Sequence, residues 1–167
     1  MRRLRNLLLL TPLALTACMY SFVGGGLPSH IRTIAVLPFE NTTPQPLIES
    51  EIETRMQAEL PRNLGVRLAS EAAADAVVRG RITGYDEIAA SVRPAGQDER
   101  VPVVQRQVRI NYEAEIYDMR QDQPLWRGQG QSVVGNFAPD SETPEQGRAR
   151  AVQEMVQEII AGAQSQW

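Results

Sequence analysis

The stretch VVQRQVRINYEAEIY, residues 103–117, alternates between apolar and polar side chains with a period of two. This pattern predicts a β-strand that has one face in the core and the other face in water. A strand of this length would span about 50 Å, which is long for a soluble sheet. The core face is predicted from the apolar even-numbered positions, which are Val104, Val108, Ile110, Tyr112, Ala114 and Ile116.

Three other stretches supply the partner strands of this predicted sheet. DAVVRGRITGY at 75–85 and PLWRGQGQSVVG at 124–135 also alternate, whereas TIAVLPF at 33–39 is a short apolar run typical of a strand buried on both faces. Unbroken alternation places Tyr85 on the same face as Arg81, and Val134 on the same face as Trp126. The polar residues 93–100, RPAGQDER, connect the strand at 75–92 to the strand at 103–117, which predicts a long projecting hairpin.

Two further segments have the period of a helix. Ile48, Ile52, Met56 and Leu60 recur every four residues and predict a helix from Leu47 that Pro61 ends. The second segment begins with TPEQ at 143–146, a capping-box pattern with proline at the first helical position. Apolar side chains then follow at spacings of three and four, and they are Ala149, Val152, Val156, Ile159 and Ala163. Small residues in 124–135 would let this helix approach the sheet closely.

The element order β-α-β-β-β-α predicts an α+β fold, a two-layer sandwich in which both helices pack on one face of a mixed sheet of about four strands. The predicted domain spans residues 31–163, and residues 164–167 form a C-terminal tail. Residues 18–30 include three consecutive glycines at 24–26 and are interpreted as a tether. Residues 1–17 precede the tether and are not part of the predicted domain.

The composition limits the chemistry available to this chain. It has 167 residues, the size of one domain, with 17 basic side chains that are all arginine, 20 acidic ones and a net charge of −3. A single cysteine, Cys18, and a single histidine, His30, exclude an internal disulfide and a zinc site made of Cys and His. No lysine is present for Schiff-base or Walker-type chemistry, and an acidic domain is not expected to bind nucleic acid.

The first 18 residues, MRRLRNLLLLTPLALTAC, combine three arginines, a short apolar region and small residues before a cysteine, as secretory signals do. The segment resembles a bacterial lipobox; the alternative is an ordinary signal peptide with a chance cysteine. The resemblance implies removal of residues 1–17 and a diacylglyceryl and an N-acyl group on Cys18, with no other cofactor. Removal leaves 14 arginines and 20 acids, a net charge of −6. Met19 after the cysteine favours the outer membrane, by analogy with lipoprotein sorting.

Several segments of the mature chain resemble LptE-like lipopolysaccharide-assembly lipoproteins. They are GLPSHIRTIAVLPFENTT at 26–43, ADAVVRGRI at 74–82 with Tyr85, the pair Leu125-Trp126, and the closing helix. The resemblance implies an outer-membrane lipoprotein that sits inside an LptD-type β-barrel, helps the barrel to assemble and assists delivery of lipopolysaccharide to the outer leaflet. It implies no catalysis, and it places the domain either facing the periplasm or inside the barrel lumen.

Two alternatives remain open at the level of the sequence. AVLPFEN at 35–41 also resembles curli-secretion and penicillin-binding-protein-activator lipoproteins, so the chain is alternatively a periplasm-facing outer-membrane lipoprotein that activates or scaffolds a cell-wall synthase or a secretion pore. A lipoprotein hydrolase is the third hypothesis, but His30 lacks a nearby serine and carboxylate in a suitable pattern. Co-purification with a barrel, or with a peptidoglycan enzyme or a ring of identical subunits, separates the first two hypotheses.

The water-facing side of the predicted sheet is rich in arginine and glutamine. Arginine binds phosphate in a planar, two-pronged way, and the lumen of an outer-membrane barrel is polar. We therefore expect this face to contact lipopolysaccharide or the barrel through Arg79, Arg81 and Arg109. The alternative phosphate-binding cluster lies near the hairpin tip and consists of Arg93, Arg100 and Arg106, and the plain alternative is a solvated face without a ligand.

Overall fold

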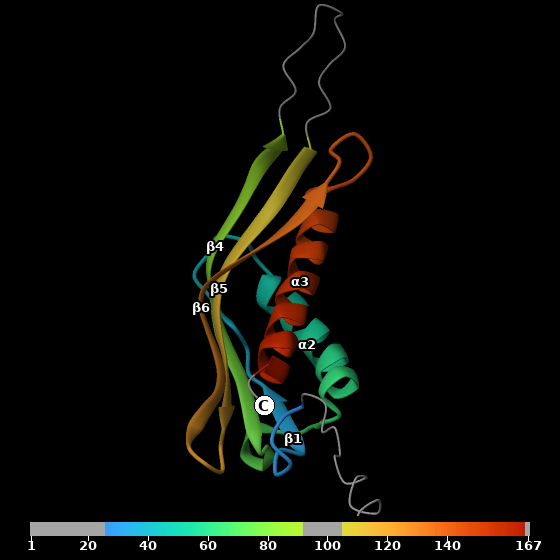
Figure 1. Ribbon diagram of the computed structural model, residues 1–167. Coiled ribbons are helices and arrows are strands. Elements are labelled where there is room, and N and C mark those ends of the chain that lie inside the picture. The colour runs from blue at the N-terminus through green and yellow to red at the C-terminus, as the bar shows by residue number, and fades with distance from the viewer. Residues whose placement is uncertain (1–25, 92–104, 166–167) are drawn as a thin grey trace, which may run out of the picture.

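The computed structural model describes residues 26–91 and 105–165 of the chain (Figure 1). Its α+β class and the order of its long elements agree with the sequence pattern. The elements in chain order are β1 (Thr33–Val36), β2 (Glu40–Asn41), α2 (Ile48–Leu64), β3 (Arg67–Leu68), the short 3-10 helix η2 (Glu71–Ala73), β4 (Ala76–Ser91), β5 (Gln105–Asp118), β6 (Gln123–Phe137) and α3 (Pro144–Ser165). No helix in these residues is both long and apolar enough to cross a bilayer.

The described strands form one mixed sheet of six strands, so the prediction of about four was too low. The order is β3-β1-β4-β5-β6, and β2 pairs separately with β4. β1 runs parallel to β3 and β4, while β4, β5 and β6 are antiparallel neighbours. The two additional strands, β2 and β3, have two residues each, and a run as short as Val66 to Leu68 fits a turn as well as a strand.

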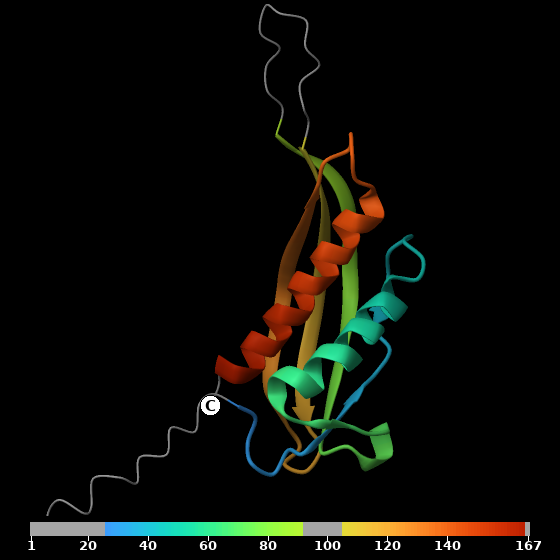
Figure 2. The ribbon, with the colours of Figure 1, turned by 90° about the vertical axis from the view of Figure 1, so that its right-hand side faces the viewer.

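Both helices pack on the same face of the sheet, as the sequence predicted. Figures 1 and 2 show α2 and α3 side by side on one face, while the opposite face of β4, β5 and β6 carries no helix. The helical spacing explains this arrangement because each helix presents one apolar stripe. The largest side chains buried between the layers include Ile48, Ile52, Met56 and Leu60 of α2, Met155 and Ile159 of α3, and Ile82, Ile110, Tyr112 and Ile116 of the sheet.

Two irregularities in the sheet correct the face assignments that unbroken alternation predicted. A register shift between Ile82 and Gly84 turns Tyr85 toward the helices, where it packs against the core. In β6, a second shift accompanies Gly130, whose φ of 62° lies in the left-handed region that favours glycine. Val134 is consequently 42% exposed, on the face opposite to Trp126. One extra residue in a strand is enough to move all later side chains to the opposite face, because side-chain direction reverses at every residue.

Helix α2 continues past Pro61, contrary to the predicted end of the helix at that residue. Proline in the last turn removes one hydrogen-bond donor and leaves the preceding turns intact. Gly65 ends the helix instead, with a φ of 68° and a backbone N–H that donates to the carbonyl of Pro61. The capping pattern of α3 is confirmed for one of its two hydrogen bonds, since the Thr143 N–H donates to the Gln146 side-chain oxygen at 3.0 Å.

Glycines allow α3 to lie directly against β6, as the small residues of this strand suggested. A Cβ on Gly135 would come within 1.8 Å of the Gly147 carbonyl oxygen and 2.6 Å of the Ala151 nitrogen, both of α3. Further along the helix, a Cβ on Gly162 would lie 2.1 Å from the Trp126 indole nitrogen. At Gly135 the backbones of β6 and α3 are therefore in direct contact. At Gly162 the backbone of α3 packs against the indole ring of Trp126.

Candidate functional site

A groove of about 330 Å³ lies on the face of the sheet that carries no helix. Its floor includes Gly80, Ala114 and Gly128, which are aligned in register across β4, β5 and β6. From the helix side these positions are filled, since a Cβ on Gly80 would meet the Phe39 ring at 2.3 Å and one on Gly128 would meet the Trp126 ring at 2.8 Å. On the outer side no side chain rises from this row, so the backbone is open to a ligand.

Charged and polar side chains from the neighbouring rows form the walls of the groove. The wall residues are Glu40, Arg79, Arg81, Glu113, Glu115, Arg127 and Gln129. Arg79, Glu115 and Arg127 form one row in register on the three strands. The Arg79 Nε donates to one oxygen of the Glu115 carboxylate at 2.5 Å, while the Nε and Nη2 of Arg127 donate to the other oxygen at 3.0 and 2.8 Å.

These contacts fix the charge state of the row. Burial acts to raise the pKa of Glu115, but the hydrogen bonds from Arg127 and Arg79 outweigh it and lower the pKa overall. The Arg79 guanidinium also lies 5.1 Å above the centre of the Tyr117 ring, a cation–π contact. The row of Arg79, Glu115 and Arg127 therefore carries a net formal charge of +1, and it has more N–H donors than the one carboxylate can accept.

The second wall of the groove is not cationic, because it contains Arg81 and two carboxylates, those of Glu40 and Glu113. Arg81 donates from its Nε to the Glu40 carboxylate at 2.8 Å, and both side chains are more than half exposed. Within the described residues the two Nη groups of Arg81 make no hydrogen bond. Exposed ion pairs of this kind contribute about 0–1 kcal/mol, so their role in holding the fold is small.

The arginines predicted as contact residues divide into three groups. Arg79 and Arg81 both line the groove. Arg109 is on the same face but lies opposite Asp86 and Val134, six residues along β5 from Glu115, which corresponds to about 20 Å. Arg106 is on the helix side, where its Nη2 lies 3.8 Å from Glu87. Arg93 and Arg100, like Cys18 and the connection between the hairpin strands, lie outside the described residues.

Sequence reasoning did not find the carboxylate partners of these arginines. Alternation showed that Glu115 and Arg127 point outward, but their pairing depends on the register between β5 and β6. A shift in that register between Ile116 and Tyr117 adds one residue on β6 between the hairpin turn and this pair, so a regular count from the turn does not give the partner. The groove is consequently less cationic than the linear sequence implied.

We expect Glu115→Gln to lower the free energy of unfolding by no more than about 1 kcal/mol, because its ion pairs are on the surface. The variant keeps the size of the side chain but leaves both guanidiniums without a negative partner. Urea unfolding of this variant beside Glu113→Gln, a wall residue of β5 that forms no ion pair within the described residues, gives the measurement. A loss above about 3 kcal/mol would show that the row holds the sheet together and is not free to act as a site.

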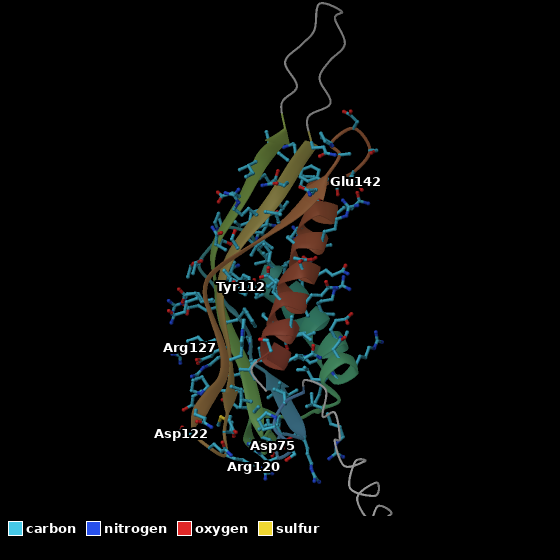
Figure 3. The ribbon with its side chains drawn as sticks, in the orientation of Figure 1. Asp75, Tyr112, Arg120, Asp122, Arg127 and Glu142 are labelled. Carbon is cyan, nitrogen blue, oxygen red and sulfur yellow. The ribbon has the colours of Figure 1, made fainter. Side chains whose placement is uncertain are left out.

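A second polar cluster, which sequence reasoning missed, lies where the N-terminal segment meets the sheet. Asp75 is 6% exposed; its Oδ2 accepts the backbone N–H groups of Arg32 and Thr33 at 2.8 and 2.9 Å, and its Oδ1 accepts Arg120 Nε at 2.7 Å. The Arg32 N–H first of all, then Thr33 and Arg120, lower the pKa of Asp75 to about 2 against the opposing effect of burial. The cluster joins β1, β4 and the β5–β6 turn (Figure 3).

His30 belongs to this cluster. Its Nε2 lies 2.5 Å from Oδ2 of Asp118, which is fully buried, and Oδ1 of Asp118 accepts the backbone N–H groups of Arg120 and Gln121. Burial acts to raise the pKa of Asp118, and these hydrogen bonds, led by His30, lower it overall. Within the described residues, no serine or threonine hydroxyl contacts the imidazole. The arrangement therefore fastens the N-terminal segment to the domain.

The chain is similar to one known family and to several solved structures. The family model for LptE, described as lipopolysaccharide-assembly, matches residues 31–162. No curated protein matches the chain. Solved structures similar to it include the PelC dodecamer from Paraburkholderia phytofirmans, with a TM-score of 0.49, 16% identity and coverage of 84% of this chain and 94% of that one. A minor lipoprotein from Acinetobacter baumannii has a TM-score of 0.48, 14% identity and coverage of 83% and 94%.

Proposed function

This chain belongs to the LptE family of lipopolysaccharide assembly, and on that premise we propose that it is an outer-membrane lipoprotein that partners an LptD-type β-barrel. In this proposal, Cys18 carries the lipid that holds the protein in the membrane, and the described domain occupies the barrel lumen. The domain assists the delivery of lipopolysaccharide to the outer leaflet and catalyses no reaction. Nucleic acid has no part in this function.

The observation that carries the proposal is the polar, helix-free face of β4, β5 and β6. Exposed arginine, glutamate and glutamine side chains lie on this face. Among the described residues of β4, β5 and β6, Val134 is the one large apolar side chain that is more than a third exposed. The interior of an outer-membrane barrel is polar, so a domain inside it needs hydrogen-bonding groups on its surface. A face that is charged but nearly balanced matches such a lumen without requiring an apolar partner.

The groove gives this face a candidate contact for the phosphate groups of lipopolysaccharide. Arg79 and Arg127 share one carboxylate, and the two Nη groups of Arg81 form no hydrogen bond within the described residues. Planar guanidinium groups bind phosphate oxygens with two parallel hydrogen bonds. We propose that Arg79 and Arg81 make this contact, with Arg109 further along the same face.

Two measurements test the proposal separately. Affinity purification of the lipidated chain from membranes is expected to recover a large outer-membrane β-barrel. Recovery of a peptidoglycan enzyme, or of a ring formed by this chain alone, contradicts the barrel partnership.

For the groove, the double variant Arg79→Gln/Arg81→Gln is expected to weaken lipopolysaccharide binding by about tenfold or more, since a hydrogen bond to a charged group contributes roughly 1.5–3 kcal/mol. The matched control is Arg106→Gln, which lies on the helix side. Equal binding by the double variant, the control and the wild type would exclude the groove as the contact.

A further inference from the structure

The wall residues of the groove form three pairs, one from each of the strands β4, β5 and β6. In chain order the pairs are Arg79 and Arg81, Glu113 and Glu115, and Arg127 and Gln129. The members of a pair are two residues apart, so they point to the same side of the sheet and lie about 7 Å apart along the strand. The groove runs between them across the three strands, a length of about 10 Å. A ligand in the groove therefore meets three pairs of side chains in turn.

The pair on β4 makes one end of the groove cationic. Arg79 and Arg81 lie on opposite walls, with side chains that are 51% and 52% exposed. The Nε of each contacts a carboxylate of the protein, but the two Nη groups of Arg81 make no hydrogen bond to the described residues. Guanidinium groups bind phosphate oxygens with paired hydrogen bonds, so this end of the groove suits a phosphate.

The pair on β5 places two carboxylates in the middle of the groove. Glu115 accepts hydrogen bonds from the arginines on both neighbouring strands. Glu113 is exposed and forms no ion pair in the described part of the chain; Arg81, opposite it in register, is bonded to Glu40 instead. A carboxylate accepts hydrogen bonds and cannot donate them. The ligand group above Glu113 must therefore carry an O–H or N–H, and a second phosphate is repelled there.

The pair on β6 offers both donors and acceptors at the other end of the groove. Figure 3 shows Arg127 on the side of the sheet that faces away from the helices. Its Nε and Nη2 are bonded to Glu115, which leaves Nη1 without a partner among the described residues. The side-chain amide of Gln129 likewise has no partner there, and an amide both donates and accepts hydrogen bonds. A ligand group that itself donates and accepts, such as a hydroxyl, suits this end.

A ligand that fills the groove needs a phosphate at β4, a hydrogen-bond donor at β5 and hydroxyl groups at β6. Inorganic phosphate fills the first position alone. Phosphoethanolamine supplies a donor for the second position, but its ammonium group cannot accept a hydrogen bond from Arg127 at the third. Glycerol phosphate has hydroxyl groups, but its binding must fix bonds that rotate freely in solution. A phosphorylated sugar carries its hydroxyl groups on a rigid ring and meets all three requirements.

The size and floor of the groove agree with a single sugar ring. Its volume of about 330 Å³ is at the lower end of the range for small-molecule sites. The floor at Gly80, Ala114 and Gly128 is backbone, so no side chain interrupts the space between the walls. The flat face of a sugar ring can therefore lie on this floor while the hydroxyl groups at its edge reach the walls.

We propose that the groove binds a phosphorylated sugar, with its phosphate between Arg79 and Arg81 and its hydroxyl groups on Glu113 and Gln129. The phosphate contact is that of the proposed function, on which this inference rests. Glu113 and Gln129 add the selection of the ligand, because they favour a phosphorylated sugar over the linear headgroups of glycerophospholipids. The groove is part of the polar face of β4, β5 and β6, so the ligand reaches it from the barrel lumen.

The test measures the affinity of the full lipidated chain for four soluble probes. The chain is held in a polyoxyethylene detergent, which contains neither sugar nor phosphate, and isothermal titration gives each Kd. The probes are N-acetylglucosamine 1-phosphate, glycerol 3-phosphate, O-phosphoethanolamine and inorganic phosphate. We expect the sugar phosphate to bind at least about tenfold more tightly than each of the others, since it gains hydrogen bonds at two further positions. Equal binding of any of the other three overturns the assignment of a sugar.

Glu113→Ala separates the sugar contact from the phosphate contact. It is expected to raise the Kd of N-acetylglucosamine 1-phosphate about fivefold or more, because a hydrogen bond to a charged acceptor is lost. The same change removes a negative charge from the groove, so the Kd of inorganic phosphate stays the same or falls. Gln129→Ala is expected to raise the Kd of the sugar phosphate alone. The matched control, Asp86→Ala, removes an exposed carboxylate opposite Arg109, outside the groove, and changes neither Kd.

Two outcomes separate this inference from the proposed function. If Glu113→Ala and Gln129→Ala leave the Kd of the sugar phosphate unchanged, or shift it together with that of inorganic phosphate, the sugar contact is wrong and the phosphate contact stands. If Arg79→Gln/Arg81→Gln binds all four probes as tightly as the wild type, the phosphate contact is wrong as well. The barrel partnership depends on neither result, because affinity purification tests it.

Discussion

Replacing Gly135 with alanine is expected to lower the free energy of unfolding by about 3–5 kcal/mol. The added Cβ would lie 1.8 Å from the Gly147 carbonyl oxygen and 2.6 Å from the Ala151 nitrogen. Both are backbone atoms of α3, so no side-chain rotation can relieve the clash and the helix must move away from β6. That movement opens gaps around Met155 and Ile159, which are fully buried under the same helix.

Gly130→Asn is the matched control for this prediction. Gly130 is on the same strand, nothing lies within 4 Å of the position of its Cβ, and asparagine tolerates the left-handed conformation. We expect this change to cost less than about 1 kcal/mol. Urea unfolding followed by circular dichroism gives both values. If Gly135→Ala and Gly130→Asn have the same small effect, the close contact between α3 and β6 is wrong.

Replacing Asp75 with asparagine is expected to lower the free energy of unfolding by about 2–3 kcal/mol at neutral pH. The carboxylate accepts hydrogen bonds on both oxygens, from the N–H groups of Arg32 and Thr33 and from Arg120. An amide has one acceptor oxygen, and its NH₂ group would face donors on the other side. Part of this buried cluster would therefore lose its acceptor.

The effect of Asp75→Asn is expected to depend on pH in one direction. The Arg32 N–H and the other donors lower the pKa of Asp75 to about 2 in the folded chain, against about 3.9 for an unfolded aspartate. The stabilisation from its ionised form is therefore complete above about pH 4 and is lost as the pH falls toward 2. The difference in unfolding free energy between wild type and variant should shrink over that range.

Asp86→Asn is the control for this prediction, because Asp86 is an exposed carboxylate on the same strand. We expect it to change the unfolding free energy by less than about 0.5 kcal/mol at each pH. A difference between Asp75→Asn and wild type that stays constant from pH 7 to pH 2 would show that the charge of Asp75 does not stabilise the cluster.

Local side-chain patterns were sufficient for the long elements of the fold. Ile48, Ile52, Met56 and Leu60 predicted the buried face of α2, and all four are fully buried. Alternation in 103–117 placed Ile110, Tyr112 and Ile116 in the core, where they are. These predictions succeed because a stripe that repeats every second residue, or every third to fourth, has one geometry that buries it.

Contacts between distant segments limited what could be predicted about the candidate site. The pairs Arg79–Glu115 and Arg127–Glu115 join three strands, and their partners follow from sheet register. Tyr85 and Val134 lie on the opposite faces from those predicted because register shifts interrupt β4 and β6. Of the four predicted contact arginines within the described residues, Arg79 and Arg81 line the groove and Arg106 and Arg109 do not.

The sequence alone determined the single cysteine and the absence of lysine, which are matters of composition. It also determined the class of the fold and the apolar faces of both helices, because these depend on neighbours within a few positions. The six-stranded sheet, the groove and the cluster around Asp75 followed only from the folded chain. The cluster shows the reason most directly, since Asp75 is 43 residues from Arg32 and 45 residues from Arg120 in sequence. They meet because parallel β1 and β4 begin at the end of the sheet where β5 turns into β6.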